Sequence, residues 1–399
     1  MILQSTAVGG METHCVDLAA EYVRRGIPVR AVLPEGSAFD GLDARFRSGG
    51  AEVDRLTTDA RSGRRAQLAR LSKLASILRA FRPTVVHVQT GGATGGLGVV
   101  ALSRALTGAT VVLTEHDVPA ERMALQDRAT KKLTDHLVHG LVAVSRRNAA
   151  LRRNRGGARE HRFGSILNGV PIPAVTDTEK ARNRAAVRDQ MGIPGDVVVI
   201  GSVVRLANGK GLDDLLRAFA IVRREMTTQL LLVGDGPLRA ELEALASELG
   251  IRADVHFAGQ RENPGVFVDA MDVFVLAVPA GSMSIALLEA MARGAPPVIT
   301  FCGPEEAVIT EETGLSAPPA DPRGLAAVLA RIVRDDALRA SLSKAAASHV
   351  STHFSVERVA DDLLELYASV GVGRVPARLR ADGAPNPRPG SRQRAAVRP

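Results

Sequence analysis

Short apolar strands alternate with amphipathic helices along most of this 399-residue chain, and that alternation restricts the possible folds more than any other feature. Two separate series are visible. The strands of the second series span 197–203, 229–233, 255–258, 273–276 and 298–300. Short buried strands separated by helices are typical of a parallel, doubly wound sheet. The chain is therefore predicted to form two Rossmann-like α/β domains, with ligands in the cleft at the carboxyl ends of the strands.

We expect the first domain to span residues 1–172 and the second to span 173–354, followed by one more helix at 355–370. A chain of this length can bury two full cores. Residues 371–399 contain seven arginines, one acid and several prolines. A segment of this composition cannot bury enough apolar surface to fold, so we expect it to be disordered. It carries most of the net charge of +8, and the two domains are close to neutral.

The composition excludes several classes of function. Aromatic residues make up only 3% of the chain and tryptophan is absent, which argues against a stacking surface for single-stranded nucleic acid. The two cysteines, Cys15 and Cys302, are too few for a disulfide framework or a zinc site. The chain also starts without a cationic leader before an apolar run. We therefore expect a cytoplasmic protein that binds no nucleic acid.

A basic segment at residues 60–114 has two interpretations. It holds eight lysines and arginines and no acid, and five of them lie on a helix pattern with a leucine stripe at 64–81. The helix either docks on an anionic membrane that carries a lipid acceptor, which would place the protein at the inner face of the membrane, or it is a solvated helix packed on the sheet. The most apolar window, 95–113, is interrupted by Arg104, so no membrane span is predicted.

The second series carries a group of candidate binding residues. Arg205 and Lys210 flank the turn after its first strand, and Glu289 lies in a helix pattern that begins near Ser282 or Ser284. Fixed cations and a helix N-terminus bind phosphate oxygens, and a carboxylate can accept both hydroxyls of a ribose. This set fits a nucleotide-sugar, which is a substrate, so no cofactor is expected. The chain lacks an Asp-x-Asp pair, and no metal is predicted. Taken singly, each residue also fits a solvated surface position.

The run from Gly201 to Gly314 resembles the donor half of retaining glycosyltransferase family 4, the group 1 type, and the resemblance extends more weakly over residues 1–370. It implies a GT-B fold, in which two Rossmann-like domains face each other across a cleft and the last helix crosses back to the first domain. It also implies that Arg205 and Lys210 hold the donor diphosphate and stabilise the charge that grows on it during transfer.

The resemblance assigns further residues to the site. Glu289 matches the second Glu of the family's Glu-x7-Glu pattern, and His116 matches a histidine that contacts the donor sugar and helps to orient the acceptor. The other matching positions are Gly9, Gly10, Ser282, Met283, Ser284, Glu305 and Glu306. The two glycines would let the backbone approach the donor at a helix start. The alternatives are a structural role for His116 and exposed turn positions for Glu305 and Glu306.

The sequence departs from the family pattern at two places. Gly281 stands where the first Glu of the Glu-x7-Glu pattern belongs, and the family's Gly-Gly-x-x-Glu loop reads Cys-Gly-Pro-Glu-Glu at 302–306. That first carboxylate lies beside the transferred sugar, where positive charge develops. The resemblance thus implies a metal-independent hexosyltransferase in carbohydrate or glycoconjugate biosynthesis, which transfers a sugar with retention to a saccharide, lipid-linked or small-molecule acceptor. A nucleotide-sugar epimerase on this fold and a donor-binding pseudoenzyme remain alternatives.

Overall fold

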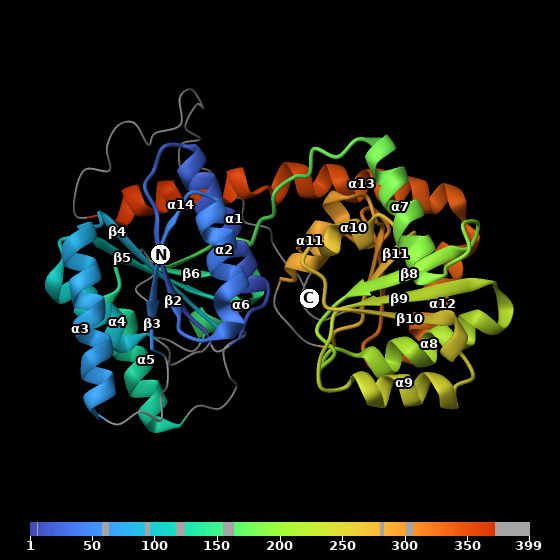
Figure 1. Ribbon diagram of the computed structural model, residues 1–399, viewed down its shortest axis with the longest axis horizontal. Helices are drawn as coiled ribbons and strands as arrows, with labels where there is room; N and C mark the ends of the chain where they lie inside the picture. The colour runs from blue at the N-terminus through green and yellow to red at the C-terminus, as the bar shows by residue number, and fades with distance from the viewer. Residues whose placement is uncertain are drawn as a thin grey trace, which may run out of the picture.

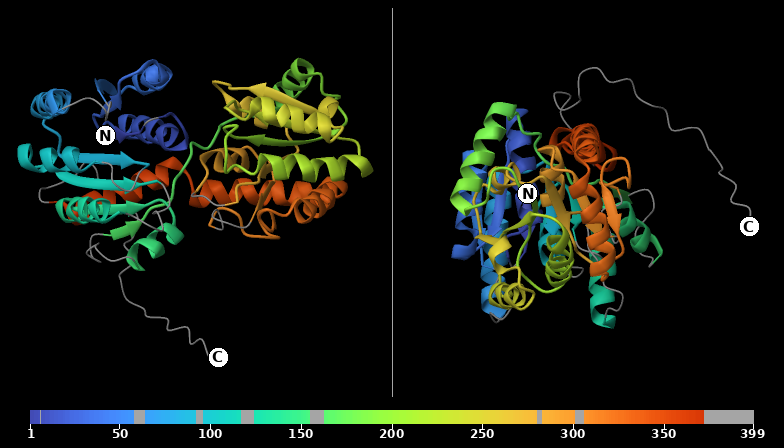
Figure 2. Two further views of the ribbon diagram at one scale, coloured as in Figure 1. Left: turned by 90° about the horizontal axis from the view of Figure 1, so that it is seen from below. Right: turned by 90° about the vertical axis from the view of Figure 1, so that its right-hand side faces the viewer.

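The computed structural model describes residues 1–5, 7–57, 64–91, 96–116, 124–154, 163–279, 283–300 and 306–371. They form two lobes, each built on one parallel sheet with helices on both faces (Figure 1). The views in Figure 2 show the lobes side by side, joined by extended chain and by the helices at the C-terminal end. This is the pair of doubly wound α/β sheets that the alternation of strands and helices predicts.

The first lobe has a seven-stranded sheet in the order β3-β2-β1-β4-β5-β6-β7. Its strands are β1 (Ile2–Gln4), β2 (Arg30–Pro34), β3 (Glu52–Leu56), β4 (Val85–Thr90), β5 (Thr110–Glu115), β6 (Gly140–Ala143) and β7 (Phe163–Ser165). Its helices are α1 (Gly10–Arg24), α2 (Asp40–Ser48), α3 (Arg64–Phe81), α4 (Leu97–Leu106), α5 (Leu125–Leu137) and α6 (Arg146–Asn154). The strand order reverses between β1 and β4, and ligands of doubly wound sheets bind at the carboxyl ends of the strands beside such a point.

The second lobe has a six-stranded sheet in the order β10-β9-β8-β11-β12-β13. Its strands are β8 (Val198–Val203), β9 (Thr228–Val233), β10 (Val255–Gly259), β11 (Val273–Leu276), β12 (Pro297–Thr300) and β13 (Leu315–Ala317). Its helices are α7 (Asp177–Met191), α8 (Leu212–Glu225), α9 (Arg239–Glu248), α10 (Pro264–Val268), α11 (Ile285–Ala292), α12 (Pro322–Arg334) and α13 (Asp336–His353). The point where the strand order reverses lies between β8 and β11.

The final helix, α14 (Val356–Val370), returns to the first lobe, as the resemblance implies. It packs against α1, β5 and β6, and its apolar face joins the core of that lobe. The chain enters α14 beside the other connection between the lobes. There the Val170 amide donates to the Phe354 carbonyl over 2.9 Å, and the Val356 amide donates to the Val170 carbonyl over 3.0 Å. Both crossings between the lobes therefore lie at one place.

The five strands expected for the second series match β8 to β12 to within one residue at each end, and α3 matches the expected range 64–81. The expectations omitted three strands, β3, β7 and β13, each of which lies at a sheet edge. No helix in the described part of the chain is both long enough and apolar enough to span a bilayer. The basic tail predicted to be disordered lies outside the described residues from position 372 onward.

Candidate functional site

Glycine turns draw the ends of three strands of the second lobe together. Gly211 has a φ of +64°, and a Cβ atom on it would lie 2.0 Å from the Ala277 carbonyl oxygen at the end of β11. Gly234 has a φ of +134°, and a Cβ there would lie 2.0 Å from the Val204 carbonyl oxygen after β8. Only glycine fits such close approaches with a positive φ. The turn that carries Arg205 is therefore held against the ends of both neighbouring strands.

Arg205 and Lys210 lie in this turn, between β8 and α8. Arg205 is exposed and Lys210 is partly buried. Neither side chain has a hydrogen bond or an ion pair to any described residue. Two cations on one turn at the carboxyl ends of parallel strands, with no protein partner among those residues, are suited to bind an anion.

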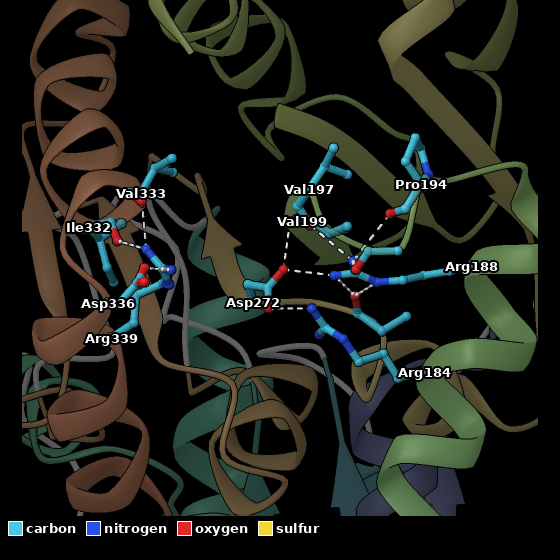
Figure 3. A network of polar contacts seen from close by, with 12 residues as sticks. Arg184, Arg188, Pro194, Val197, Val199, Asp272, Ile332, Val333, Asp336 and Arg339 are labelled. Atoms are coloured by element: carbon cyan, nitrogen blue, oxygen red, sulfur yellow. Dashed lines mark hydrogen bonds and ion pairs between the residues drawn. The ribbon is translucent and has the colours of Figure 1, made fainter. Parts of the chain in front are cut away.

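Some arginines of the same lobe are bound by several protein groups, and Figure 3 shows this for Arg188. The Arg188 side chain is only 3% exposed and donates to the carbonyls of Gly195, Val197 and Ala270 and to the Asp272 carboxylate, which lies 2.7 Å away. This pairing fixes α7 against the sheet. Arg188 therefore has a structural role, whereas Arg205 and Lys210 have no such set of contacts to the described residues.

The N-terminus of α11 is a second candidate phosphate-binding element of this lobe. Ser284 caps this helix, and its hydroxyl accepts a hydrogen bond from the Leu287 amide over 3.3 Å. The predicted cap at Ser284 is thus confirmed, while Ser282 and Gly281 lie outside the described residues. The Met283 side chain is buried in the core of the lobe. Only its backbone can therefore take part in the donor contact that the sequence predicts for it.

The glycine loop of the first lobe faces this helix start. Gly9 is the N-cap of α1, and its amide donates to the Glu12 carboxylate over 2.7 Å. A Cβ on Gly10 would lie 3.3 Å from Cγ1 of Ile285, the first residue of α11. Because Gly10 has no side chain, α1 and α11 can approach this closely. A larger residue at this position would press against Ile285. The structure thus brings the predicted loop and the predicted helix N-terminus together across the two lobes.

Glu289 is partly buried on α11, on the side that faces α1. Burial raises the pKa of its carboxyl from 4.5 to about 7, and the negative charge of Asp17 on α1 adds to this rise. Burial likewise raises the pKa of Asp17 to about 6, although Arg45 lies 3.7 Å away and opposes the effect. The Glu289 carboxylate has no hydrogen bond or ion pair to the described residues. An acceptor kept without partners in this way is suited to hydroxyl donors of a ligand.

His116 is buried at the end of β5, and its Nε2 lies 2.8 Å from the Gln89 side-chain oxygen. Its pKa is held well below the usual value, first by burial and then by the charges of His14 and His87. The ring is consequently neutral near pH 7, with one N–H donor and one acceptor nitrogen. It can bind hydroxyl groups but does not provide a fixed positive charge.

Two family models match the sequence. The glycosyl transferase 4-like domain matches residues 9–163, and glycosyl transferases group 1 matches residues 183–349. This chain belongs to the group 1 glycosyltransferases. The matched ranges contain the glycine loop and His116 in the first lobe and Arg205, Lys210 and Glu289 in the second. Membership of this family confirms the resemblance inferred from the sequence motifs.

Named relatives of this glycosyltransferase act on several kinds of molecule. The lipopolysaccharide core biosynthesis glycosyltransferase LpsD of Rhizobium meliloti is 27% identical over 90% of this chain and 95% of its own length. A D-inositol 3-phosphate glycosyltransferase of Corynebacterium urealyticum is 34% identical, but over only 52% of this chain and 51% of that protein. A crystal structure of HepE from Anabaena with UDP and glucose superposes with a TM-score of 0.78, at 20% identity, over 92% of this chain and 98% of that one. This likeness confirms the GT-B fold.

Glu306 of this glycosyltransferase has a contact that the sequence did not predict. Its carboxylate accepts a hydrogen bond from the backbone amide of Arg146, the first residue of α6 in the opposite lobe. The acid thus reaches a helix N-terminus, where negative charge is favourable. The predicted role of Glu306 at the donor sugar stays a prediction, and the adjacent Glu305 lies outside the described residues.

Sequence reasoning missed three side chains around the site of this glycosyltransferase, namely Asp17, Arg45 and Gln89. Asp17 raises the pKa of Glu289 from the opposite lobe, and Arg45 lowers it. No spacing in the sequence reveals this proximity. Gln89 is the last polar residue of a buried strand pattern, and a polar side chain at the carboxyl end of a parallel strand could have indicated it. His87 on β4 is also buried, and its Nε2 lies 2.7 Å from the Thr114 hydroxyl.

Proposed function

We propose that this glycosyltransferase transfers a sugar from a nucleotide diphosphate sugar to an acceptor hydroxyl with retention of configuration and without a metal. One observation carries the proposal. Arg205 and Lys210, which have no partner among the described residues, lie on a turn held at the strand ends of the second lobe, and in the same lobe the N-terminus of α11 meets the Gly9–Gly10 loop of the first lobe. This is the arrangement that a diphosphate leaving group needs.

In the proposed mechanism, the bond between the anomeric carbon and the diphosphate oxygen breaks as the acceptor oxygen attacks the same face. Negative charge grows on the leaving phosphate, and Arg205, Lys210 and the amides at the start of α11 stabilise it. The acceptor proton passes to the departing phosphate oxygen. His116, as a neutral ring, would bind hydroxyls of the donor sugar. Closure of the lobes would exclude water and limit hydrolysis.

We assign the ribose to Glu289, because an ionised carboxylate on α11 can accept from both ribose hydroxyls. The base and the sugar are open. UDP and UDP-glucose are bound by HepE, and one relative is named as GDP-mannose-dependent. A thermal-shift screen of UDP, GDP and their sugars against the full chain would identify the donor, because a ligand that binds only the folded state raises the unfolding temperature.

Lys210→Ala tests the diphosphate role directly. Loss of the ammonium should lower kcat/KM for transfer at least tenfold, about 1.4 kcal/mol in the barrier. Lys344→Ala, which removes an exposed lysine on α13, is the matched control and should leave the kinetics unchanged. Equal rates for the Lys210 variant and the wild type would remove the phosphate role.

NMR of the product's anomeric proton tests retention, and assays with a chelator test metal independence.

A donor-binding pseudoenzyme is the second candidate, and Gly281 favours it because the family has a carboxylate there. Gly281→Glu distinguishes the two. A large gain in transfer would indicate a decayed site, whereas an unchanged or lower rate would indicate a site that works with the backbone amides near α11. An assay without acceptor addresses the epimerase alternative, because an epimerase would form a new nucleotide-sugar unaided.

For the acceptor, we propose a lipid-linked saccharide at an anionic membrane, supported by the name of the LpsD relative and by one surface. Leu68 on α3 and Leu125 and Leu133 on α5 are 66%, 83% and 49% exposed, and exposed Arg65 and Lys132 flank them. Helix α4 packs against both α3 and α5, so the two helices that carry these residues lie on the same side of the first lobe (Figure 1). Apolar side chains with flanking cations are typical of membrane-surface contact.

The structure narrows the basic surface predicted from the sequence. Arg70 donates to the Gln4 side-chain oxygen over 2.8 Å, and Lys73 pairs with Glu35 over 3.1 Å, so these two cations of α3 are engaged within the lobe. Cosedimentation with anionic and with neutral vesicles tests the membrane proposal. Leu125→Asp should release the protein from anionic vesicles, and wild-type protein that stays in solution with both would refute the contact.

A further inference from the structure

A chain of buried polar side chains links the crossing helix α14 to His116. The Tyr367 hydroxyl on α14 lies 2.6 Å from Nδ1 of His87, and Nε2 of His87 lies 2.7 Å from the Thr114 hydroxyl. The side-chain nitrogen of Gln89 lies 3.2 Å and 3.3 Å from the two ring nitrogens of His87. The Gln89 oxygen then reaches Nε2 of His116. All five residues are buried, so water does not replace these contacts freely.

The position of the Gln89 amide over His87 decides which way that amide points. An atom almost equally close to both ring nitrogens lies over the ring face, because in the ring plane it would collide with Cε1. The face of an aromatic ring is negative, so it attracts the amide N–H and repels the amide oxygen. This holds for either tautomer of His87. The Gln89 oxygen must therefore point away from His87 and toward His116.

An amide oxygen can only accept, so His116 must donate from Nε2. Since the ring is neutral, the proton on Nε2 leaves Nδ1 as the acceptor nitrogen. Within the described residues, no second hydrogen-bond partner is found for the His116 ring. The acceptor nitrogen is thus available for a hydroxyl of the donor sugar or of the acceptor.

We propose that Gln89 is a positioning residue that holds His116 as the Nε2–H tautomer, with Nδ1 ready to accept a hydrogen bond from a substrate hydroxyl. The inference rests on the proposed function only for the identity of that hydroxyl. Tyr367 supports the same arrangement from α14 by fixing His87. The helix that crosses between the lobes would thereby secure the orientation of a site histidine in the first lobe.

The tautomer can be measured on the full chain without substrate. ¹⁵N spectra of histidine-labelled protein, with the His116 signals assigned by their loss in His116→Ala, should show a protonated Nε2 and an unprotonated Nδ1 between about pH 6 and pH 8. Gln89→Leu should give a mixture of tautomers. A protonated Nδ1 in the wild type, or an unchanged tautomer in Gln89→Leu, would overturn the proposal.

Kinetics supply the second readout. Gln89→Leu should lower kcat for transfer about tenfold while KM for the donor stays nearly constant, because His116 remains present but misoriented. Gln89→Glu keeps an accepting oxygen and adds a charge that favours the imidazolium, so its rate should recover as pH rises. This variant also keeps the proposal testable if the leucine variant does not fold. A Gln89→Glu rate with the wild-type pH profile would count against the assignment.

Gln229 provides a matched control in the other lobe. Its side-chain oxygen lies 2.6 Å from Nε2 of His256, and its nitrogen donates to Asp254 over 2.9 Å. Gln229→Leu removes the same kind of glutamine–histidine contact from a strand and should leave both the His116 tautomer and kcat unchanged. Failure of the proposed function has a different signature, because the wild type would then show no transfer while the tautomer of His116 stayed as expected.

Discussion

Glu289→Gln should stabilise the protein and at the same time weaken nucleotide binding. The pKa of this carboxyl is raised from 4.5 to about 7 by burial and by the negative charge of Asp17. Keeping it ionised above pH 7 therefore costs about 3 kcal/mol relative to the unfolded chain. A neutral amide of nearly the same shape removes that cost, and it cannot accept two ribose hydroxyls as strongly as a carboxylate does.

The pH dependence follows from the direction of the shift. Below pH 4.5 the carboxyl is protonated in both the folded and the unfolded chain, so it contributes no difference. Between pH 4.5 and about 7 the unfolded chain loses the proton first, and the free energy of unfolding falls as pH rises. Above pH 7 the loss is complete. Glu289→Gln should therefore not show this decrease in the free energy of unfolding. At pH 8 the variant should be more stable than the wild type by up to about 3 kcal/mol.

Urea denaturation at pH 5 and pH 8 measures the gain in stability of Glu289→Gln. Calorimetric titration with the nucleotide diphosphate identified in the donor screen measures its loss of affinity. Wild-type affinity should rise with pH through about 7, as Glu289 ionises, more steeply than in the variant. Asp17→Asn should lower the pKa of Glu289 and move the wild-type transition to lower pH. Identical stability of the wild type and Glu289→Gln at pH 8, or undiminished nucleotide affinity in the variant, would refute the reasoning.

Three other substitutions test how the second lobe is held together, and none of them removes a group that is proposed to bind the donor. Gly211→Ala places a methyl group 2.0 Å from the Ala277 carbonyl and should destabilise the chain by about 2 to 4 kcal/mol in thermal or urea denaturation. Gly209→Ala has a similar positive φ but no atom within 4 Å of the new Cβ, so about 1 kcal/mol is expected, and equal losses in both would contradict the close-contact argument. Arg188→Met leaves Asp272 and several carbonyls short of a donor, which should cost roughly 3 kcal/mol or more, and a loss below about 1 kcal/mol would show that the buried network is dispensable.

The sequence was sufficient for the fold because its signals are local. Apolar strand patterns and helix periodicity mark β8, β9 and β11, and glycines mark the turns that join them. The edge strand β3 was missed because its sequence, Glu-Val-Asp-Arg-Leu, has charged residues on a partly exposed strand. The strands β7 and β13 are three residues long, which is too short to show a period.

The candidate site was only half predictable for a related reason. Arg205, Lys210 and Ser284 lie next to turns or helix starts, so a motif reveals them. The proximity of Asp17 to Glu289 and the contact from Glu306 to Arg146 depend on how one lobe meets the other. These relations join residues more than 150 positions apart in the sequence, and no spacing rule applies to them.

The paired backbone at Val170 and Ser355 also limits how the two halves of the molecule can travel. Because the two connections between the lobes are hydrogen-bonded to each other, we expect them to form one hinge. The lobes should then open and close by rotation about this hinge rather than by sliding past each other. Displacement then grows with radius. His14, whose Nδ1 lies 2.9 Å from the Gly169 carbonyl oxygen beside this hinge, should therefore move least, and the ends of the lobes farthest from the hinge should move most. Such a rotation would preserve the relative positions of residues near the hinge. It would open space for an incoming ligand between the outer ends of the lobes.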